Sequence, residues 1–253
     1  MQSLTSSTFW DEWWPGKIAL SELKADDFQY GRNGFFVRLL RRKLGPLDGI
    51  KVVELGGACS LVLLALAKWH GAQVTAVDYS PEGLDLTERL FQANSCGVEL
   101  IEADFLNWKP ARQYDLVTHY GVLEHFTDPE PLIRLSAQLL APNARLLFSM
   151  PNMRALGAYF WRRWSPELWS KHIYHSDAAI EKACAEAGLS VAEAFHFGKP
   201  MVQQCPWERK GFMQGVVTFG QRVADQAGEF PILDRGMGWI SGHRGFLVSP
   251  SAR

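Results

Sequence analysis

The stretch Lys51-Val-Val-Glu-Leu-Gly-Gly-Ala-Cys-Ser60 decides the fold, together with the segment Val74-Thr-Ala-Val-Asp78 that follows it. The first stretch predicts an apolar strand that runs into a turn of small residues. An apolar helix is predicted over about 61–69, and the second strand then ends on a carboxylate 22 residues after Gly56. This βαβ pattern indicates a site for an adenosine-containing ligand, with Asp78 placed to accept hydrogen bonds from ribose hydroxyls.

The turn after the first strand differs from the Gly-x-Gly-x-x-Gly pattern of dinucleotide sites. Ala58 and Ser60 stand where that pattern needs glycines, and the acid Glu54 lies just before the turn. A pyrophosphate would be repelled by this carboxylate, whereas the ammonium and sulfonium groups of S-adenosylmethionine would be attracted to it. The sign of the charge therefore favours S-adenosylmethionine over a nicotinamide cofactor, and an oxidoreductase is the least supported function.

Composition excludes several other classes of protein. A net charge of −1 over 253 residues gives no sign of a nucleic-acid surface, and 47% hydrophobic residues support a full core. The four cysteines lie far apart, as expected of reduced thiols in the cytoplasm, and no set of residues has metal-ligand spacing. No apolar run reaches about 18 residues, so we expect no transmembrane segment. Nothing in the sequence indicates the oligomeric state.

Strands and helices are expected to alternate along the chain. Apolar runs predict strands at 51–55, 73–77, 98–102, 114–119, 144–149, 189–194 and 246–249. Helices are predicted after the N-cap residues Ser80 and Ser176 and after Asp128-Pro129. The alternation predicts an α/β protein with a Rossmann-like, doubly wound, mostly parallel seven-stranded sheet, which binds ligands at the carboxyl ends of its strands.

The chain divides into a cap and a main domain. Residues 1–48 are rich in aromatic side chains and predict an N-terminal cap segment, and residues 49–253 predict the S-adenosylmethionine-binding domain. Within that domain, 153–175 and 197–240 are expected to form lid or insert segments. We expect Trp10, Trp13 and Trp14 to fold over the cofactor or the substrate.

The ends of successive strands carry an ordered series of motifs. Glu54-Leu-Gly-Gly-Ala-Cys-Ser follows the first strand, and Asp78-Tyr-Ser-Pro follows the second. Glu102-Ala-Asp-Phe105 comes next, and Tyr120-Gly-Val-Leu-Glu-His125 follows the fourth strand. Over roughly residues 48–196 this series resembles the class I S-adenosylmethionine-dependent methyltransferases, in particular the small-molecule branch with a Leu-Glu-His motif.

The resemblance implies a set of cofactor-binding residues at the strand ends. By position, these are Glu54, Gly56, Gly57, Ala58, Asp78, Tyr79, Asp104, Phe105 and Tyr120. The resemblance implies that Glu54 and the small-residue turn hold the methionine part and that Asp78 and Tyr79 contact the ribose and the adenine. It further implies that Asp104 and Phe105 bind the adenine, with Tyr120 near the methionine part or the transferred methyl group. Ala58 departs from the pattern, because a positive φ at a residue with a Cβ would cost about 1 kcal/mol.

Two histidines are the candidates for catalysis. His125 and His172 would serve as a base for a nucleophile that must lose a proton, since an unperturbed histidine has a pKa of about 6.5. His125 packing against the next helix, and a solvent-facing loop at 171–175, are the structural alternatives. Asp104 has the alternative of an ordinary turn residue, and His119 is expected to point into the packing of the sheet.

The predicted function is transfer of a methyl group from S-adenosylmethionine to an oxygen or nitrogen of a small molecule. The aromatic residues of the N-terminus and of 153–175 suggest a cavity for an aromatic or amphipathic acceptor. The alternative is a catalytically degenerate, methyltransferase-like scaffold subunit, for which Ala58 and Ser60 are the motivation.

Overall fold

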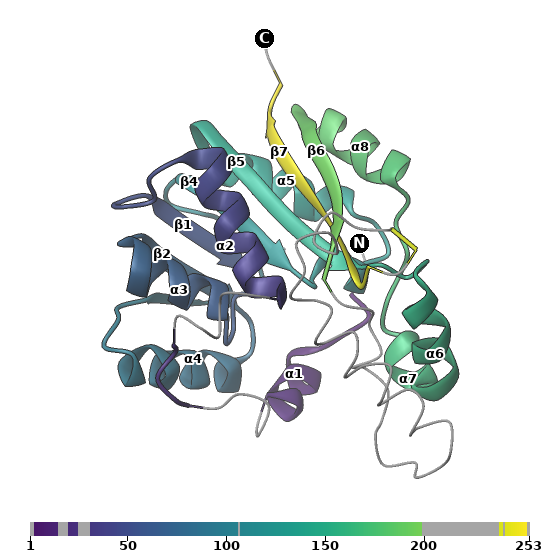
Figure 1. Ribbon diagram of the computed structural model, residues 1–253, viewed down its shortest axis with the longest axis horizontal. Coiled ribbons are helices and arrows are strands. Elements are labelled where there is room, and N and C mark those ends of the chain that lie inside the picture. The colour runs from purple at the N-terminus through teal and green to yellow at the C-terminus, as the bar shows by residue number, and fades with distance from the viewer. Residues whose placement is uncertain are drawn as a thin grey trace.

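A computed structural model of the protein describes residues 3–14, 20–24, 31–105, 107–198, 238–239 and 241–251 (Figure 1). These residues contain a seven-stranded sheet covered by helices. The strands are β1 Lys51–Leu55, β2 Gln73–Asp78, β3 Glu99–Glu102, β4 Tyr114–Tyr120, β5 Leu140–Pro151, β6 Leu189–Phe197 and β7 His243–Pro250. The helices are α1 Ser7–Trp13, α2 Gly31–Leu44, α3 Leu61–His70, α4 Pro81–Ala93, α5 Glu130–Leu139, α6 Leu156–Trp164, α7 Pro166–Trp169 and α8 Asp177–Glu186, with the short 3-10 helix η2 at Leu123–His125.

The strands lie in the order β3-β2-β1-β4-β5-β7-β6. The first five strands in this order pair in parallel, whereas β7 pairs antiparallel with both β5 and β6. From β1 to β3 the chain adds strands on one side of β1, and from β4 onwards it adds them on the other side, so the order of the strands reverses between β1 and β4. The Rossmann-like, mostly parallel sheet is confirmed.

Two apolar layers cover the two faces of the sheet. Val52 packs with α2, α3 and α4 on one face, and Val53 packs with α5 and α8 on the other. Figure 1 shows α2 in front of the sheet and α5 behind it. Because neighbouring residues of a strand point to opposite faces, a continuous apolar strand such as β1 needs helices on both sides.

Local signals begin and end the helices as expected. The hydroxyl oxygens of Ser80 and Ser176 accept hydrogen bonds from the N–H groups of Gly83 and Ala179, at 3.0 and 3.1 Å. Gly71 ends α3 with a left-handed φ of 67°. The side-chain caps satisfy backbone N–H groups that are left free where a helix begins. Glycine, which has no Cβ, readily adopts the left-handed conformation that ends a helix.

Strand β5 begins four residues earlier than the sequence predicts. Pro142 and Asn143 favour a turn there, and Asn143 does adopt a positive φ of 66°. The structure accommodates these residues in an irregular stretch of the ladder, since the pairing with β4 shifts between Tyr114 and Leu116. A bulge of this kind lets an unpaired residue remain inside a strand.

The predicted cap and lid segments are only partly described. Helices α1, α6 and α7 lie beyond the carboxyl ends of the parallel strands (Figure 1). Most of the predicted 197–240 insert lies outside the described residues. Among the described helices, none has the length and apolar character needed to cross a membrane.

Candidate active site

A cavity of about 250 Å³ lies where β1, β2, β4 and β5 end. Helix α1 supplies three aromatic residues to its lining, its C-cap Trp14 adds a fourth, and the segment that follows α7 supplies His172. Since open α/β sheets bind ligands outside the carboxyl ends of their strands, this cavity is the candidate active site.

The structure brings seven of the eleven predicted site residues to this cavity: Gly56, Asp78, Tyr79, Phe105, Tyr120, His125 and His172. Glu54 lies in β1, Gly57 and Ala58 belong to the turn that follows it, and none of the three lines the cavity. Asp104 is exposed in a turn, where its carboxylate accepts a hydrogen bond from the Asn107 amide at 2.6 Å. For Asp104 the described geometry matches the structural alternative of a turn residue.

The turn after β1 needs small residues for steric reasons. Gly56 has a φ of 69°, and a Cβ there would lie 2.7 Å from Cγ2 of Val122. A Cβ on Gly57 would lie 2.9 Å from the carbonyl oxygen of Glu54. Both glycines thus let the turn after β1 approach its neighbours closely. The sequence did not decide whether Ala58 has a positive φ. In the structure Ala58 does not, and Cys59 does, with a φ of 56°.

Ser60 has a structural reason for standing where a glycine is usual. Its hydroxyl donates a hydrogen bond to the Glu54 carboxylate at 2.8 Å and accepts one from the N–H of Leu63 at 3.2 Å. The residue therefore caps α3 and holds a buried carboxylate at the same time. Ser60 therefore replaces the usual glycine because it is the N-cap of α3, and the turn keeps its conformation.

Asp78 connects the ends of β1 and β2. Its two carboxylate oxygens accept hydrogen bonds from the N–H groups of Ala58 and Ser80, at 3.1 and 3.0 Å. Burial raises the pKa of this carboxyl above its usual value, and the backbone hydrogen bonds oppose that rise. A third backbone N–H, that of Tyr79, also contacts this carboxylate, so about one of its four lone-pair sites is left to accept from a ligand hydroxyl at the cavity.

Two aromatic residues line the cavity beside Asp78. Phe105 is buried and meets Phe126 edge to face, with ring centroids 6.1 Å apart. The Tyr79 hydroxyl lies 3.5 Å from the Thr5 hydroxyl, and burial raises the pKa of the tyrosine. These rings offer apolar faces of the kind that an adenine contacts.

His125 and His172 lie together at the cavity, with ring centroids 4.6 Å apart. Burial lowers the pKa of His125 to about 4 and that of His172 to about 3, with His125 adding to the effect at His172. The sequence analysis expected a pKa near 6.5, and the structure departs from this because both rings are removed from water. Both histidines are therefore neutral at pH 7.

Two other buried histidines, His175 and His119, do not line the cavity. His175 is buried, and its Nε2 donates to the carbonyl oxygens of Leu123 and Phe126 at 3.3 and 3.1 Å. His119 is fully buried in β4 and stacks on Phe148 at 4.8 Å, as the sequence analysis expected. His175 thus holds the chain around η2, and His119 belongs to the core.

The N-terminal segment is attached to the site at several points. The N–H of Leu4 donates to the carbonyl oxygen of His125 at 2.8 Å, and the Asp11 carboxylate accepts from the Ser80 hydroxyl at 2.6 Å. Trp10 meets the His125 ring edge to face at 5.3 Å. Trp13 and Trp14 also line the cavity, and their folding over a cofactor or a substrate stays a prediction.

Glu124, which is not among the predicted site residues, has a buried side chain that lines the cavity beside His125. The signal was present, since Glu124 is the acid of the Leu-Glu-His motif. Two carboxylates, Asp78 and Glu124, therefore face this cavity, and neither lysine nor arginine lines it within the described part of the chain. Two carboxylates at one cavity favour a cationic ligand and disfavour a phosphorylated one.

The family follows from a comparison with known proteins. A family model described as a methyltransferase domain matches residues 28–194 of the chain. The chain belongs to this family of class I S-adenosylmethionine-dependent methyltransferases. The Leu-Glu-His branch within the family stays a prediction.

Curated relatives match about half of the chain. The ubiquinone biosynthesis O-methyltransferase of Coxiella burnetii is 34% identical over 116 residues, which are 46% of this chain and 49% of that protein. The protein of the same name from Escherichia coli is 30% identical over 137 residues, or 51% of this chain and 57% of that one. The match spans about half the length of each relative.

Solved structures share the fold at low sequence identity. Magnesium protoporphyrin IX methyltransferase of Synechocystis with bound S-adenosylhomocysteine is 17% identical, with a TM-score of 0.60 over 97% of this chain and 95% of that one. The [4+2]-cyclase SpnF is 14% identical, with a TM-score of 0.60 over 87% of this chain and 81% of that one. Similarity at this level shows the fold alone.

Proposed function

We propose that this protein transfers a methyl group from S-adenosylmethionine to an oxygen or nitrogen of a small molecule with an aromatic or amphipathic body. The observation that carries the proposal is that two carboxylates, those of Asp78 and Glu124, line the cavity. S-adenosylmethionine is cationic at its sulfur and its ammonium group, so such a cavity suits it. Membership of the methyltransferase family adds support.

The residues of the chain fit the parts of this cofactor. Asp78 would accept from ribose hydroxyls, and Tyr79 and Phe105 would contact the adenine. The turn at Gly56 and Gly57 has the close backbone approach that a bound nucleoside requires. Glu54, Ala58 and Asp104 stay predictions, and none of the three lines the cavity. Once bound, S-adenosylmethionine supplies an electrophilic methyl group.

The acceptor is proposed to lie between the histidines and α1. Phe9, Trp10 and Trp13 line this side of the cavity and would hold a planar or apolar body by stacking. His125 and His172 would face its nucleophilic atom. Alignment of that atom with the methyl group can contribute roughly 7–11 kcal/mol, so holding the acceptor is the main task of the protein. Oxygen is the favoured atom, since the curated relatives are named as O-methyltransferases.

Calorimetry with S-adenosylhomocysteine tests the cofactor site. Asp78→Asn should weaken binding about 10–100-fold, because charge-assisted hydrogen bonds contribute about 1.5–3 kcal/mol. Asp115→Asn is the matched control, since Asp115 also accepts a backbone N–H, that of Lys51 at 2.8 Å, but does not line the cavity. Equal affinity in both variants, or no binding by the wild type, would remove the cofactor assignment.

Methyl transfer to matched acceptors tests the reaction. Labelled S-adenosylmethionine is incubated with aryl alcohols and aryl amines that share one carbon skeleton, and methylated product is counted. We expect product from the alcohols. A scaffold protein would bind the nucleoside without turnover of either series. The structural motive for a scaffold is weakened, because Ala58 has no positive φ and Ser60 caps a helix.

A further inference from the structure

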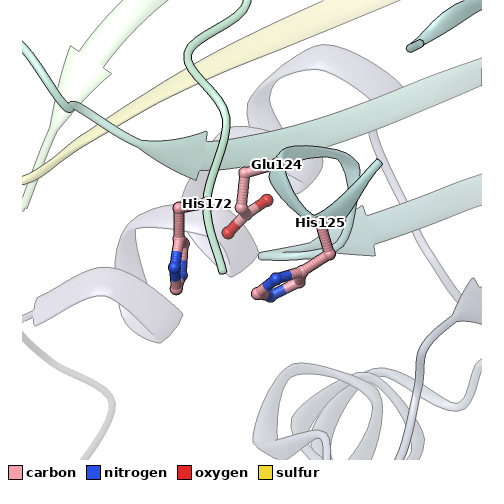
Figure 2. A group of neighbouring side chains, drawn as sticks. All are labelled: Glu124, His125 and His172. Carbon is pink, nitrogen blue, oxygen red and sulfur yellow. The ribbon is translucent and has the colours of Figure 1, made fainter. Parts of the chain in front are cut away.

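Three side chains with metal-ligand chemistry meet at the Leu-Glu-His turn. Glu124 and His125 come from η2, and His172 comes from the segment after α7. One ligand-capable atom of each residue lies within 4.8 Å of the others. Figure 2 shows the Glu124 carboxylate between the two imidazole rings. Glu124 and His125 are only 2% and 5% exposed, so this is not a solvated surface cluster.

Hydrogen bonds determine which ring nitrogens carry lone pairs. Nδ1 of His125 lies 2.8 Å from the carbonyl oxygen of Lys171, and Nδ1 of His172 lies 2.8 Å from that of Leu168. A carbonyl oxygen can only accept, so both Nδ1 atoms must donate. Each neutral ring then keeps its lone pair on Nε2. Metal-binding histidines are commonly oriented in this way, with the other nitrogen donating to a backbone carbonyl.

The two segments that carry the three side chains are joined to each other. The N–H of Ile173 donates to the carbonyl oxygen of Glu124 at 2.7 Å. His175 adds its hydrogen bonds to the carbonyl oxygens of Leu123 and Phe126. The His172 ring also packs edge to face against the buried Trp161, with centroids 4.6 Å apart. A site built on segments held in this way has little backbone freedom to lose when a ligand binds.

We propose that Glu124, His125 and His172 bind a divalent first-row transition ion through one carboxylate oxygen and two Nε2 atoms. Two imidazoles and one carboxylate suit Zn²⁺ or Fe²⁺, whereas Mg²⁺ and Ca²⁺ prefer sets of oxygen ligands. Ligand atoms around a tetrahedral zinc lie roughly 3.3 Å apart, so the three side chains, whose ligand-capable atoms lie within 4.8 Å of one another, must move closer to bind the ion. Side-chain rotation accommodates a change of this size.

The proposed ion would keep a coordination position for a further ligand. Three protein ligands leave the fourth position of a tetrahedral ion, and all three residues line the same cavity. The identity of that fourth ligand rests on the proposed function: it would be the hydroxyl oxygen of the acceptor, whose pKa the ion would lower. The histidines would then act by holding the ion, and the proton that the hydroxyl loses would pass to water.

Zinc binding to the full chain tests this site. Protein treated with a chelator is titrated with ZnCl₂ by calorimetry, and the bound metal is counted by elemental analysis. We expect one equivalent of zinc for the wild type and no matching heat with MgCl₂. Glu124→Gln and His172→Phe should each lose at least about 10–100-fold in zinc affinity. His172→Phe keeps an aromatic ring beside Trp161, and circular dichroism reports whether each variant folds.

The matched control is His119→Phe, the same change at a buried histidine outside the group. The chain has seven histidines, so zinc can also bind adventitiously. Zinc affinity that His119→Phe retains and His172→Phe loses supports the site, and equal affinity in the two variants overturns it. Binding of S-adenosylhomocysteine is measured on the same wild-type protein. If the protein binds the nucleoside but not zinc, only the proposed metal site is refuted. If it binds zinc but not the nucleoside, only the proposed cofactor site is refuted.

Discussion

The contact between the turn after β1 and the turn after β4 gives a quantitative prediction. Gly56 has a φ of 69°, and its missing Cβ would lie 2.7 Å from Cγ2 of Val122. Gly56→Ala therefore introduces two separate costs. A left-handed backbone with a Cβ costs about 1–2 kcal/mol, and overpacking of a tight contact typically adds about 1–3 kcal/mol. We expect the free energy of unfolding to fall by about 2–5 kcal/mol.

Gly49→Ala separates the two costs. Gly49 has nearly the same φ, 73°, but a Cβ there meets nothing within 4 Å. This variant should lose only the backbone cost of about 1–2 kcal/mol. Urea denaturation followed by circular dichroism measures both variants under the same conditions. A Gly56→Ala variant that is no less stable than Gly49→Ala would refute the steric reasoning.

The double variant Gly56→Ala, Val122→Ala tests the contact itself. Removing both Cγ methyls of Val122 leaves its Cβ 3.9 Å from the new methyl group, which is ordinary van der Waals contact. The two substitutions should then be less destabilising together than the sum of their separate effects, by about 1–3 kcal/mol. Additive effects would show that the two turns do not touch. Nucleoside affinity should fall in Gly56→Ala and recover in the double variant.

Two further variants test the reasons given for polar residues in the core. Ser60→Ala should lower the free energy of unfolding in urea by about 1–3 kcal/mol, because it removes a helix cap and a hydrogen bond to the buried Glu54. Ser176→Ala removes an exposed cap alone and should cost about 1 kcal/mol or less; equal losses would contradict the role of Glu54. Burial lowers the pKa of His119 to about 3, so its neutral form stabilises the fold above pH 6.5, and that stability is lost as the pH falls towards 3, by up to about 1.4 kcal/mol per pH unit. His119→Phe should flatten the dependence of the melting temperature on pH in this range, and an unchanged slope would contradict the assignment.

The local elements were predictable because their signals are local. Each of these signals concerns only a few neighbouring residues: the apolar run at 51–55, the cap at Ser80 and the acids at strand ends. The structure has the corresponding strands and helices. The βαβ pattern also predicted which strand ends would meet, since parallel strands bring their carboxyl ends to one edge of the sheet. Gly56, Asp78, Tyr79, Phe105 and the fourth-strand motif therefore reach one cavity.

Contacts between segments far apart in the chain had no such signal. The sequence near His172 does not predict that its ring lies beside His125 and Glu124. That position depends on the hydrogen bonds between 171–175 and η2. The lowered pKa values of the two histidines likewise follow from burial by other parts of the chain. The insertion of β7 between β5 and β6 depends on antiparallel pairing between distant strands.

The sequence by itself determined the class of fold, the edge of the sheet that carries the site and the acidic character of that site, because repeated apolar strands and the residues that follow them encode these locally. The tertiary structure alone decided which side chains share the cavity, which carboxylate serves a helix cap and which histidines are held neutral beside Glu124. These depend on packing and on exclusion of water, which are properties of segments brought together by folding and not of any one segment.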